Sequence, residues 1–227
     1  MSFTYSYLAA GCDVHELQAP LLASWPVLEL AEPAQEFASW DSAYQRAVPR
    51  CGYLRGTHPE DVKFLFRDGV WSVIANISLC MSGDGDSLAE LSRRVGRVVV
   101  ATTQGTVGYA QLLVFEAGAA IRSITAEGGH TAETGTPLPE EAGIPLETFY
   151  LDELDTVRQR LGLSSFLAAE PAGPVTALHV LDRTPYPDIA AGFGSAAHRS
   201  ETPAVGEVLV RERNQKRPAV SPLAVHF

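Results

Sequence analysis

The feature that most constrains the fold is a run of three strand-like segments joined by very short turns. Residues 97–104 (RVVVATTQ), 106–116 (TVGYAQLLVFE) and 119–127 (AAIRSITAE) are rich in β-branched and aromatic side chains. The turns between them, QGT and EAG, each contain a glycine, which readily adopts the positive φ that tight turns require. Because strands joined by such short turns run antiparallel, the sequence predicts an antiparallel β-meander.

A second hairpin precedes this run. Residues 62–66 (VKFLF) and 70–79 (VWSVIANISL) flank Asp68-Gly69, and Asp-Gly between apolar runs is the strongest short-range signal for a hairpin. A helical segment at about 87–95 lies between the hairpin and the meander. The order β-β-α-β-β-β predicts an α+β fold with helices packed on one face of the sheet.

The remaining segments carry weaker signals. Asp13 could cap a helix over residues 13–24, but Pro20 is expected to break it. Residues 128–145 (GGHTAETGTPLPEEAGIP) show no periodicity and are expected to form a long irregular loop. The other expected elements are a strand at 3–10, helices at 39–48 and 147–163, and a strand at 175–181.

The domain organisation follows from this pattern. Residues 1–182 are expected to form a single α+β domain whose sheet core spans about 62–127. Residues 183–227 are dominated by proline, glycine and alanine with little periodicity, which predicts an irregular C-terminal arm.

The stretch CMSGDGDSLAELSRRVG, residues 80–96, resembles a metal or phosphate loop at first sight. An EF-hand loop that starts at Asp84 needs an oxygen ligand at its fifth position and glycine at its sixth, and Leu88 and Ala89 stand there. A phosphate loop would need a Gly-Lys-Ser/Thr ending, which is missing. Ser87 followed by Glu90 instead matches a capping box, so the stretch is interpreted as a helix start with Ser87 as the cap.

Charge and composition restrict the class of partner. The net charge is −10; residues 183–227 carry six basic and four acidic side chains (+2), which leaves −12 on residues 1–182. An acidic body repels phosphate backbones and favours a basic protein partner, so nucleic-acid binding by this domain is not expected. Apolar stretches are too short to cross a bilayer, and the N-terminus lacks the basic region of a signal peptide, so a cytoplasmic location is expected.

Two groups of residues could carry chemistry. Cys12 with His15 and Cys51 with His58 supply the residue types of a Cys2His2 zinc site, but their spacing does not match paired zinc knuckles. The segment from His130 to Glu141 collects a histidine and several glutamates, which could form a metal site, an acid/base pair or simply an acidic contact surface. A metal site or an acid/base pair would need this segment to fold back on itself, and the sequence contains no GxSxG, HExxH or complete glycine-rich nucleotide motif. The sequence therefore predicts no catalytic residue, no metal site and no cofactor.

Residues 62–146 resemble, loosely, small bacterial α+β domains of the kind that serve as immunity proteins to polymorphic toxins. The stretches that carry the resemblance are FRDGVWSVIANI, LAELSRRVGRVVV, GYAQLLVFEAGAAIRSI and GTPLPEE. The resemblance covers less than half of the chain and includes no catalytic residues. It implies a binding module that acts by surface complementarity.

The leading hypothesis is therefore a non-enzymatic acidic binding protein, most concretely an immunity or antitoxin-like inhibitor that occludes a basic, toxin-like partner. The expected partner-binding residues are the acids of one segment: Glu127, Glu133, Glu140 and Glu141. One alternative is a hydrolase or transferase with its site on the His130–Glu141 loop. Another is a scaffold subunit of a larger assembly.

Overall fold

The computed structural model describes residues 4–50, 62–77, 79–166, 171 and 173–182. The chain divides into two units, residues 1–185 and 186–227, and the described residues all belong to the first. The C-terminal arm expected over 183–227 and the pair Cys51 and His58 lie outside the described residues. None of the described helices is both long and apolar enough to cross a membrane.

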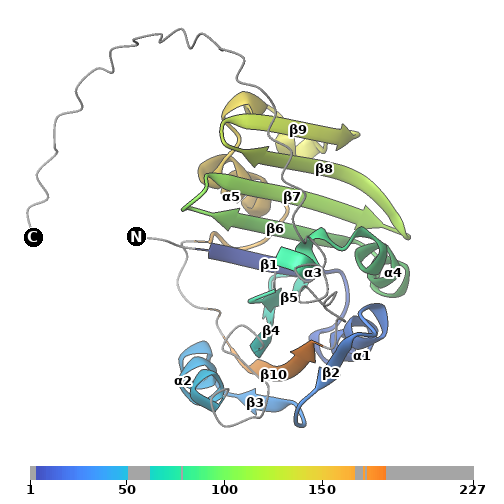
Figure 1. The fold of residues 1–227 in the computed structure, drawn as a ribbon, viewed down its shortest axis with the longest axis vertical. Helices are drawn as coiled ribbons and strands as arrows, with labels where there is room; N and C mark the ends of the chain where they lie inside the picture. Colours follow the sequence, from blue (N-terminus) through green and yellow to red (C-terminus); the bar gives the residue numbers. More distant parts are fainter. Residues whose placement is uncertain (1–3, 51–61, 78, 167–170, 172, 183–227) are drawn as a thin grey trace, which may run out of the picture. The chain divides into compact units, whose positions relative to one another are not determined.

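The described residues form a ten-stranded antiparallel sheet with α-helices, which confirms the α+β class (Figure 1). The strand order is β2-β10-β4-β5-β1-β6-β7-β8-β9, and β3 also pairs with β10. The strands are β1 (Thr4–Ala10), β2 (Leu28–Leu30), β3 (Gln35–Phe37), β4 (Val62–Asp68), β5 (Trp71–Ala75), β6 (Val98–Gln104), β7 (Tyr109–Glu116), β8 (Ala119–Glu127), β9 (His130–Gly135) and β10 (Val175–Asp182).

The helices lie between these strands in the chain and pack against the sheet. They are α1 (Val14–Ser24), α2 (Trp40–Arg50), α3 (Leu79–Gly83), α4 (Gly85–Val95) and α5 (Leu151–Arg160), with short 3-10 helices η2 (Pro139–Glu141) and η3 (Leu146–Thr148) before α5. The expected hairpin is confirmed: Asp68 pairs with Trp71, and Gly69 in the turn has φ +58°. The expected helix over 147–163 is confirmed for Leu151–Arg160.

The N-terminal strand occupies the middle of the sheet. β1 lies between β5 and β6, where Ala10 pairs with both Ser72 and Val98. The succession predicted for residues 62–127 is therefore interrupted in space, because the last strand of the first hairpin does not pair with the first strand of the meander. β1 joins them instead (Figure 1).

Helices cover both faces of the sheet, whereas one covered face was expected. On one face α1 and α4 bury Leu17, Leu21, Leu88 and Leu91 against the sheet. On the other, α2 and α5 bury their own apolar side chains, among them Leu154. The reason is visible in the strands: β4 and β6 bury successive residues rather than alternate ones, so both of their sides need cover.

The stretch at residues 80–96 is a helix start, but its cap is not Ser87. α4 begins at Gly85, two residues before the expected start at about residue 87, and the side chain of Asp84 accepts a hydrogen bond from Ser87 N (3.2 Å). Glu90 does not reach back to the helix start. It pairs instead with Arg93 and Arg94, further along the helix.

This geometry predicts which residue carries the capping energy. Asp84→Ala is expected to lower the free energy of unfolding by about 1 kcal/mol, because it leaves an amide of the first helical turn without its acceptor. Ser87→Ala, the matched control, should cost much less, since its backbone amide rather than its side chain makes the bond. Urea denaturation of both variants measures the difference, and a larger loss for Ser87→Ala would contradict the assignment.

Two further expectations were wrong. Pro20 lies inside α1 without breaking it, because Leu17 and Leu21 on either side are fully buried against the sheet and hold the helix in place. The segment 128–145 is not a loop throughout, since His130–Gly135 forms β9 at the edge of the sheet. Its side chains are mostly exposed and polar, so the strand leaves no apolar alternation in the sequence.

Candidate functional site

The acidic segment singled out in the sequence forms one end of the sheet. β8 and β9 make a hairpin in which Glu127 pairs with His130, and the two-residue turn is Gly128-Gly129. Both glycines have positive φ, +57° and +82°, which is the conformation that a tight two-residue hairpin turn requires. The turn therefore fixes which residues of β8 and β9 face each other.

A buried arginine holds this hairpin together. Arg122 on β8 is only 2% exposed. Its Nε donates to Glu141 Oε1 (2.9 Å), and its Nη2 donates to Glu141 Oε2 (2.7 Å) and to Glu133 Oε2. Its Nη1 donates to the backbone oxygen of Thr134 (3.3 Å). One guanidinium thus binds the edge strand β9 and the 3-10 helix η2 to β8.

The guanidinium keeps its charge in this position. Burial by itself would lower the pKa of Arg122, but the hydrogen bonds to Glu141 and Glu133 outweigh it and raise that pKa above the ordinary arginine value. Two carboxylates share one cation, so the three side chains together keep a net charge of −1. The cluster is a fixed structural element with an excess negative charge.

The same cluster orders the segment after β9. Glu141 Oε1 also accepts from Leu138 N (3.0 Å), which closes the turn of η2. From α5, Arg160 Nη1 donates to the backbone oxygens of Glu140 (2.9 Å) and Ala142 (2.7 Å). The acidic segment is therefore held by side chains from β8 and α5.

The four predicted partner-binding acids occupy different environments. Glu127 is exposed, the side chain of Glu133 is 47% exposed, and Glu140 is partly exposed. Glu141 is only 7% exposed and paired with Arg122, so it supports the surface from beneath and is not part of it. Glu147, which was not among the predicted residues, is exposed just after this segment.

This end of the sheet carries a clear local charge. Residues 119–147 contain five glutamates and one arginine, a net charge of −4 with His130 neutral. The arginine was the residue that sequence reasoning missed. Its signal was a charged side chain at a position of AAIRSITAE that alternation assigns to the buried side, together with Ile124 and Ala126.

The structure separates His130 from the acids that an acid/base site would need. Successive residues of a strand point to opposite faces. Glu133 is paired with Ile124 and binds Arg122 on the face covered by α5, whereas His130 is paired with Glu127 on the other face. His130, Glu133 and Glu141 therefore do not come together, as the alternative of an enzyme site on this loop would require.

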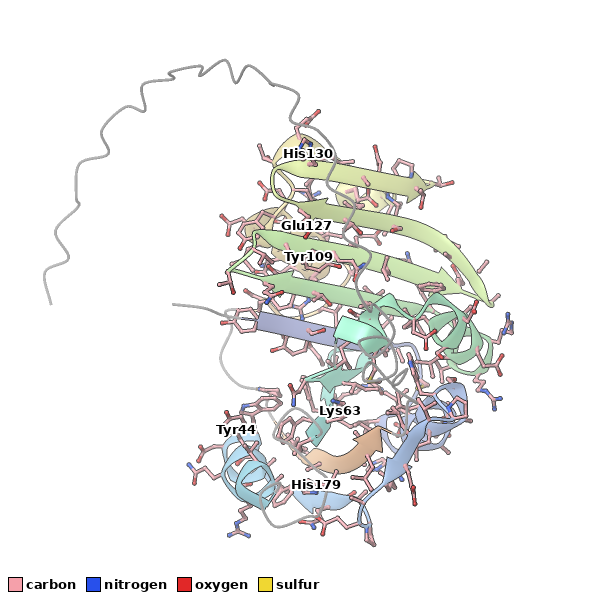
Figure 2. All side chains as sticks on the ribbon, viewed as in Figure 1. Tyr44, Lys63, Tyr109, Glu127, His130 and His179 are labelled. Atoms are coloured by element: carbon pink, nitrogen blue, oxygen red, sulfur yellow. The ribbon has the colours of Figure 1, made fainter. Side chains whose placement is uncertain are left out.

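His130 belongs instead to a row of polar side chains that crosses three strands. The register, continued one residue past the Ala110–Ala126 pair, places Tyr109 of β7 across from Glu127 of β8, which pairs with His130 of β9. Figure 2 shows the three side chains one above another on neighbouring strands. Burial, and then the nearby charge of Glu127, raise the pKa of Tyr109, so its phenol remains a hydrogen-bond donor at neutral pH.

The cysteine and histidine near the N-terminus do not form an activated pair. Cys12 is half-buried, and burial, with the neighbouring Glu16 and Asp13, raises the pKa of its thiol. A raised pKa reduces the thiolate fraction and thus the nucleophilicity. His15 lies 3.9 Å from Glu36, and the described residues contain no group of three potential metal ligands.

The part of the sheet formed by β8, β9 and the Tyr109 end of β7, together with η2 and η3, combines negative charge with a defined geometry, and we call it the acidic end. It offers exposed carboxylates, a half-buried tyrosine and an edge strand on a framework fixed by Arg122. Comparison of the chain with protein-family models, with curated proteins and with solved structures found no match.

Proposed function

We propose that the protein is a non-enzymatic acidic binding protein, most concretely an inhibitor of the immunity or antitoxin kind that occludes a basic protein partner. The observation that supports this most directly is the net charge of −4 on residues 119–147, presented on a framework that Arg122 fixes. A surface that keeps its shape before binding loses little conformational entropy in the complex.

The charge and the aromatic residue have separate roles in this proposal. Exposed carboxylates at the rim of an interface mainly accelerate association with a basic surface. Partly buried aromatic side chains tend to determine how long a complex lasts. The exposed Glu127 and Glu147 supply the first contribution, and Tyr109, half-buried beside Glu127 on the same face of the sheet, is the available anchor.

A binding function also suits the separation of the titratable groups. His130 and Glu133 point to opposite faces of β9, and Glu141 is engaged by Arg122. Occlusion of a partner by surface complementarity requires none of these groups to act on each other. The acids are then needed only for the negative electrostatic potential that they create at this surface.

The test follows association kinetics with the product of the adjacent gene, at several ionic strengths. The double variant Glu127→Gln with Glu147→Gln is expected to lower the on-rate by about tenfold at low salt and to flatten its salt dependence, with a smaller effect on the off-rate. The matched control is Glu36→Gln with Glu116→Gln. It removes the same charge from β3 and from the opposite end of β7, and it should change the on-rate much less.

Two outcomes would overturn the proposal. The first is the absence of a complex between the purified protein and its genomic neighbours. The second is a complex whose on-rate does not respond to salt or to the acidic-end variant. If the two double variants lowered the on-rate equally, the total net charge of the protein, and not the acidic end in particular, would control association.

A further inference from the structure

We infer that β9 is a docking edge, to which an extended, lysine- or arginine-bearing segment of the partner adds as one more strand. This inference rests on the function proposed above and specifies how the acidic end would bind. Among the described residues β9 is the last strand of the sheet, and Figure 1 shows it beside β8. The free side of such a strand is a template for another chain.

The hydrogen-bonding pattern identifies the main-chain groups that are available. Just past β9, Thr136 N donates to Ile121 O (3.2 Å). In an antiparallel pair, residues that exchange hydrogen bonds alternate with residues that do not. The bonded pairs between β8 and β9 are therefore Ser123 with Thr134, Thr125 with Ala132, and Glu127 with His130. It follows that Thr131 and Glu133 direct their N–H and C=O groups away from β8.

These outward groups have no hydrogen-bond partner among the described residues. The backbone hydrogen bonds of the described turns and loops include none to Thr131 or Glu133. The side chain of Thr131 is engaged, since its Oγ1 donates to Leu146 O (2.8 Å), but this bond leaves the main chain free. The edge thus offers two donors and two acceptors at the spacing of a strand.

The charges beside the edge select the kind of segment. Glu133 shares Arg122 with Glu141, so its half-exposed carboxylate keeps excess negative charge on one face of β9. Glu127 lies exposed on the opposite face. Side chains of an added strand alternate between these two faces, and a cation can meet a carboxylate on either of them.

The same charges argue against a second copy of this chain as the occupant. Pairing β9 with another β9 would bring two segments of net charge −4 together, and like charges on neighbouring strands destabilise the pair. A charge that points inward from an edge strand is a known protection against unwanted pairing. In β9 the carboxylate of Glu133 would disfavour pairing with neutral and acidic strands, so basic strands remain the favoured partners.

The test uses hydrogen exchange of individual amides, followed by NMR, on the full chain. The probe is a short capped peptide of alternating lysine with threonine or valine. One control peptide has glutamate in place of lysine, and a second keeps the lysines but contains prolines that prevent strand formation. The basic strand-forming peptide is expected to slow exchange at Thr131 and Glu133 by about tenfold or more, while Ala132 and Thr134 are already protected by β8.

A pair of variants tests the main chain directly. Thr131→Pro removes an outward N–H and should abolish the added protection at Glu133, since proline is tolerated at an edge whose N–H faces solvent. Thr131→Val is the matched control: it also loses the bond to Leu146 O but keeps the N–H, and it should bind the peptide as the unmodified protein does.

The outcomes separate this inference from the proposed function. Equal protection by both basic peptides, protection by the acidic peptide, protection that grows with protein concentration alone, or no protection at all would each overturn strand addition. Failure of strand addition together with a salt-dependent complex with the neighbouring gene product would leave the proposed function standing. Failure of that complex would remove the proposed function itself.

Discussion

Replacing Arg122 with leucine is expected to lower the free energy of unfolding by about 3 to 5 kcal/mol, the usual cost of removing one partner from a buried ion pair. The reason is that Glu141, which is 7% exposed, would keep a buried carboxylate without its cation. Glu133 and the backbone oxygen of Thr134 would also lose their donors. Urea denaturation measures the loss, and amide exchange in β9 should rise with it.

Two controls define what the measurement means. Adding Glu141→Leu to Arg122→Leu should recover part of the lost stability, because a buried apolar pair costs less than a buried unpaired charge. Arg94→Leu removes an arginine from the exposed pair with Glu90 and should hardly change stability. An Arg122→Leu variant as stable as Arg94→Leu would show that the cluster does not hold the edge.

Gly135→Ala is expected to destabilise the protein by about 3 kcal/mol and to loosen β9 in particular. An added Cβ would lie 2.2 Å from the backbone oxygen of Ile121 and 2.8 Å from its carbonyl carbon. Gly135 also has φ +86°, which an alanine adopts only with strain. Since the obstructing atoms belong to the backbone of β8, relief requires the end of β9 to move away.

The matched control for this change is Gly143→Ala. Gly143 has a similar φ of +76°, but an added Cβ would meet nothing within 4 Å. Its cost should be confined to the backbone strain, about 1 to 2 kcal/mol. Thermal and urea unfolding measure the loss of stability of each variant, and the difference between the two losses is the contribution of the close contact between β8 and β9. Equal losses would contradict this interpretation.

The elements that could be predicted from the sequence are those with a strong local signal. The strand at 119–127 was predicted with the bounds observed for β8, because its glycine-containing turns mark both ends. The Asp68-Gly69 hairpin and the helix within 147–163 carry similarly local information. Each of these signals depends on neighbouring residues alone, so it predicts the element without knowledge of the long-range strand pairing.

The elements that could not be predicted depend on partners far along the chain. β9 exists because β8 supplies its hydrogen bonds, and its exposed side chains need no apolar pattern. Arg122 is satisfied by Glu133 and Glu141, 11 and 19 residues later. The acids of this segment are evident in the sequence, but the sequence could not show that Glu141 is buried or that His130 and Glu133 point to opposite faces of β9.

The central position of β1 has a consequence for the order in which the protein can be assembled. In the sheet that the described residues form, β1 joins the group containing β4 and β5 to the group containing β6 to β9. Thr4 pairs with Gln104, 100 residues later in the chain. Closing so long a loop is entropically unfavourable, and such non-local contacts slow folding. During synthesis, the first strand therefore has to wait for β6 to emerge from the ribosome before the two halves of the sheet can close around it.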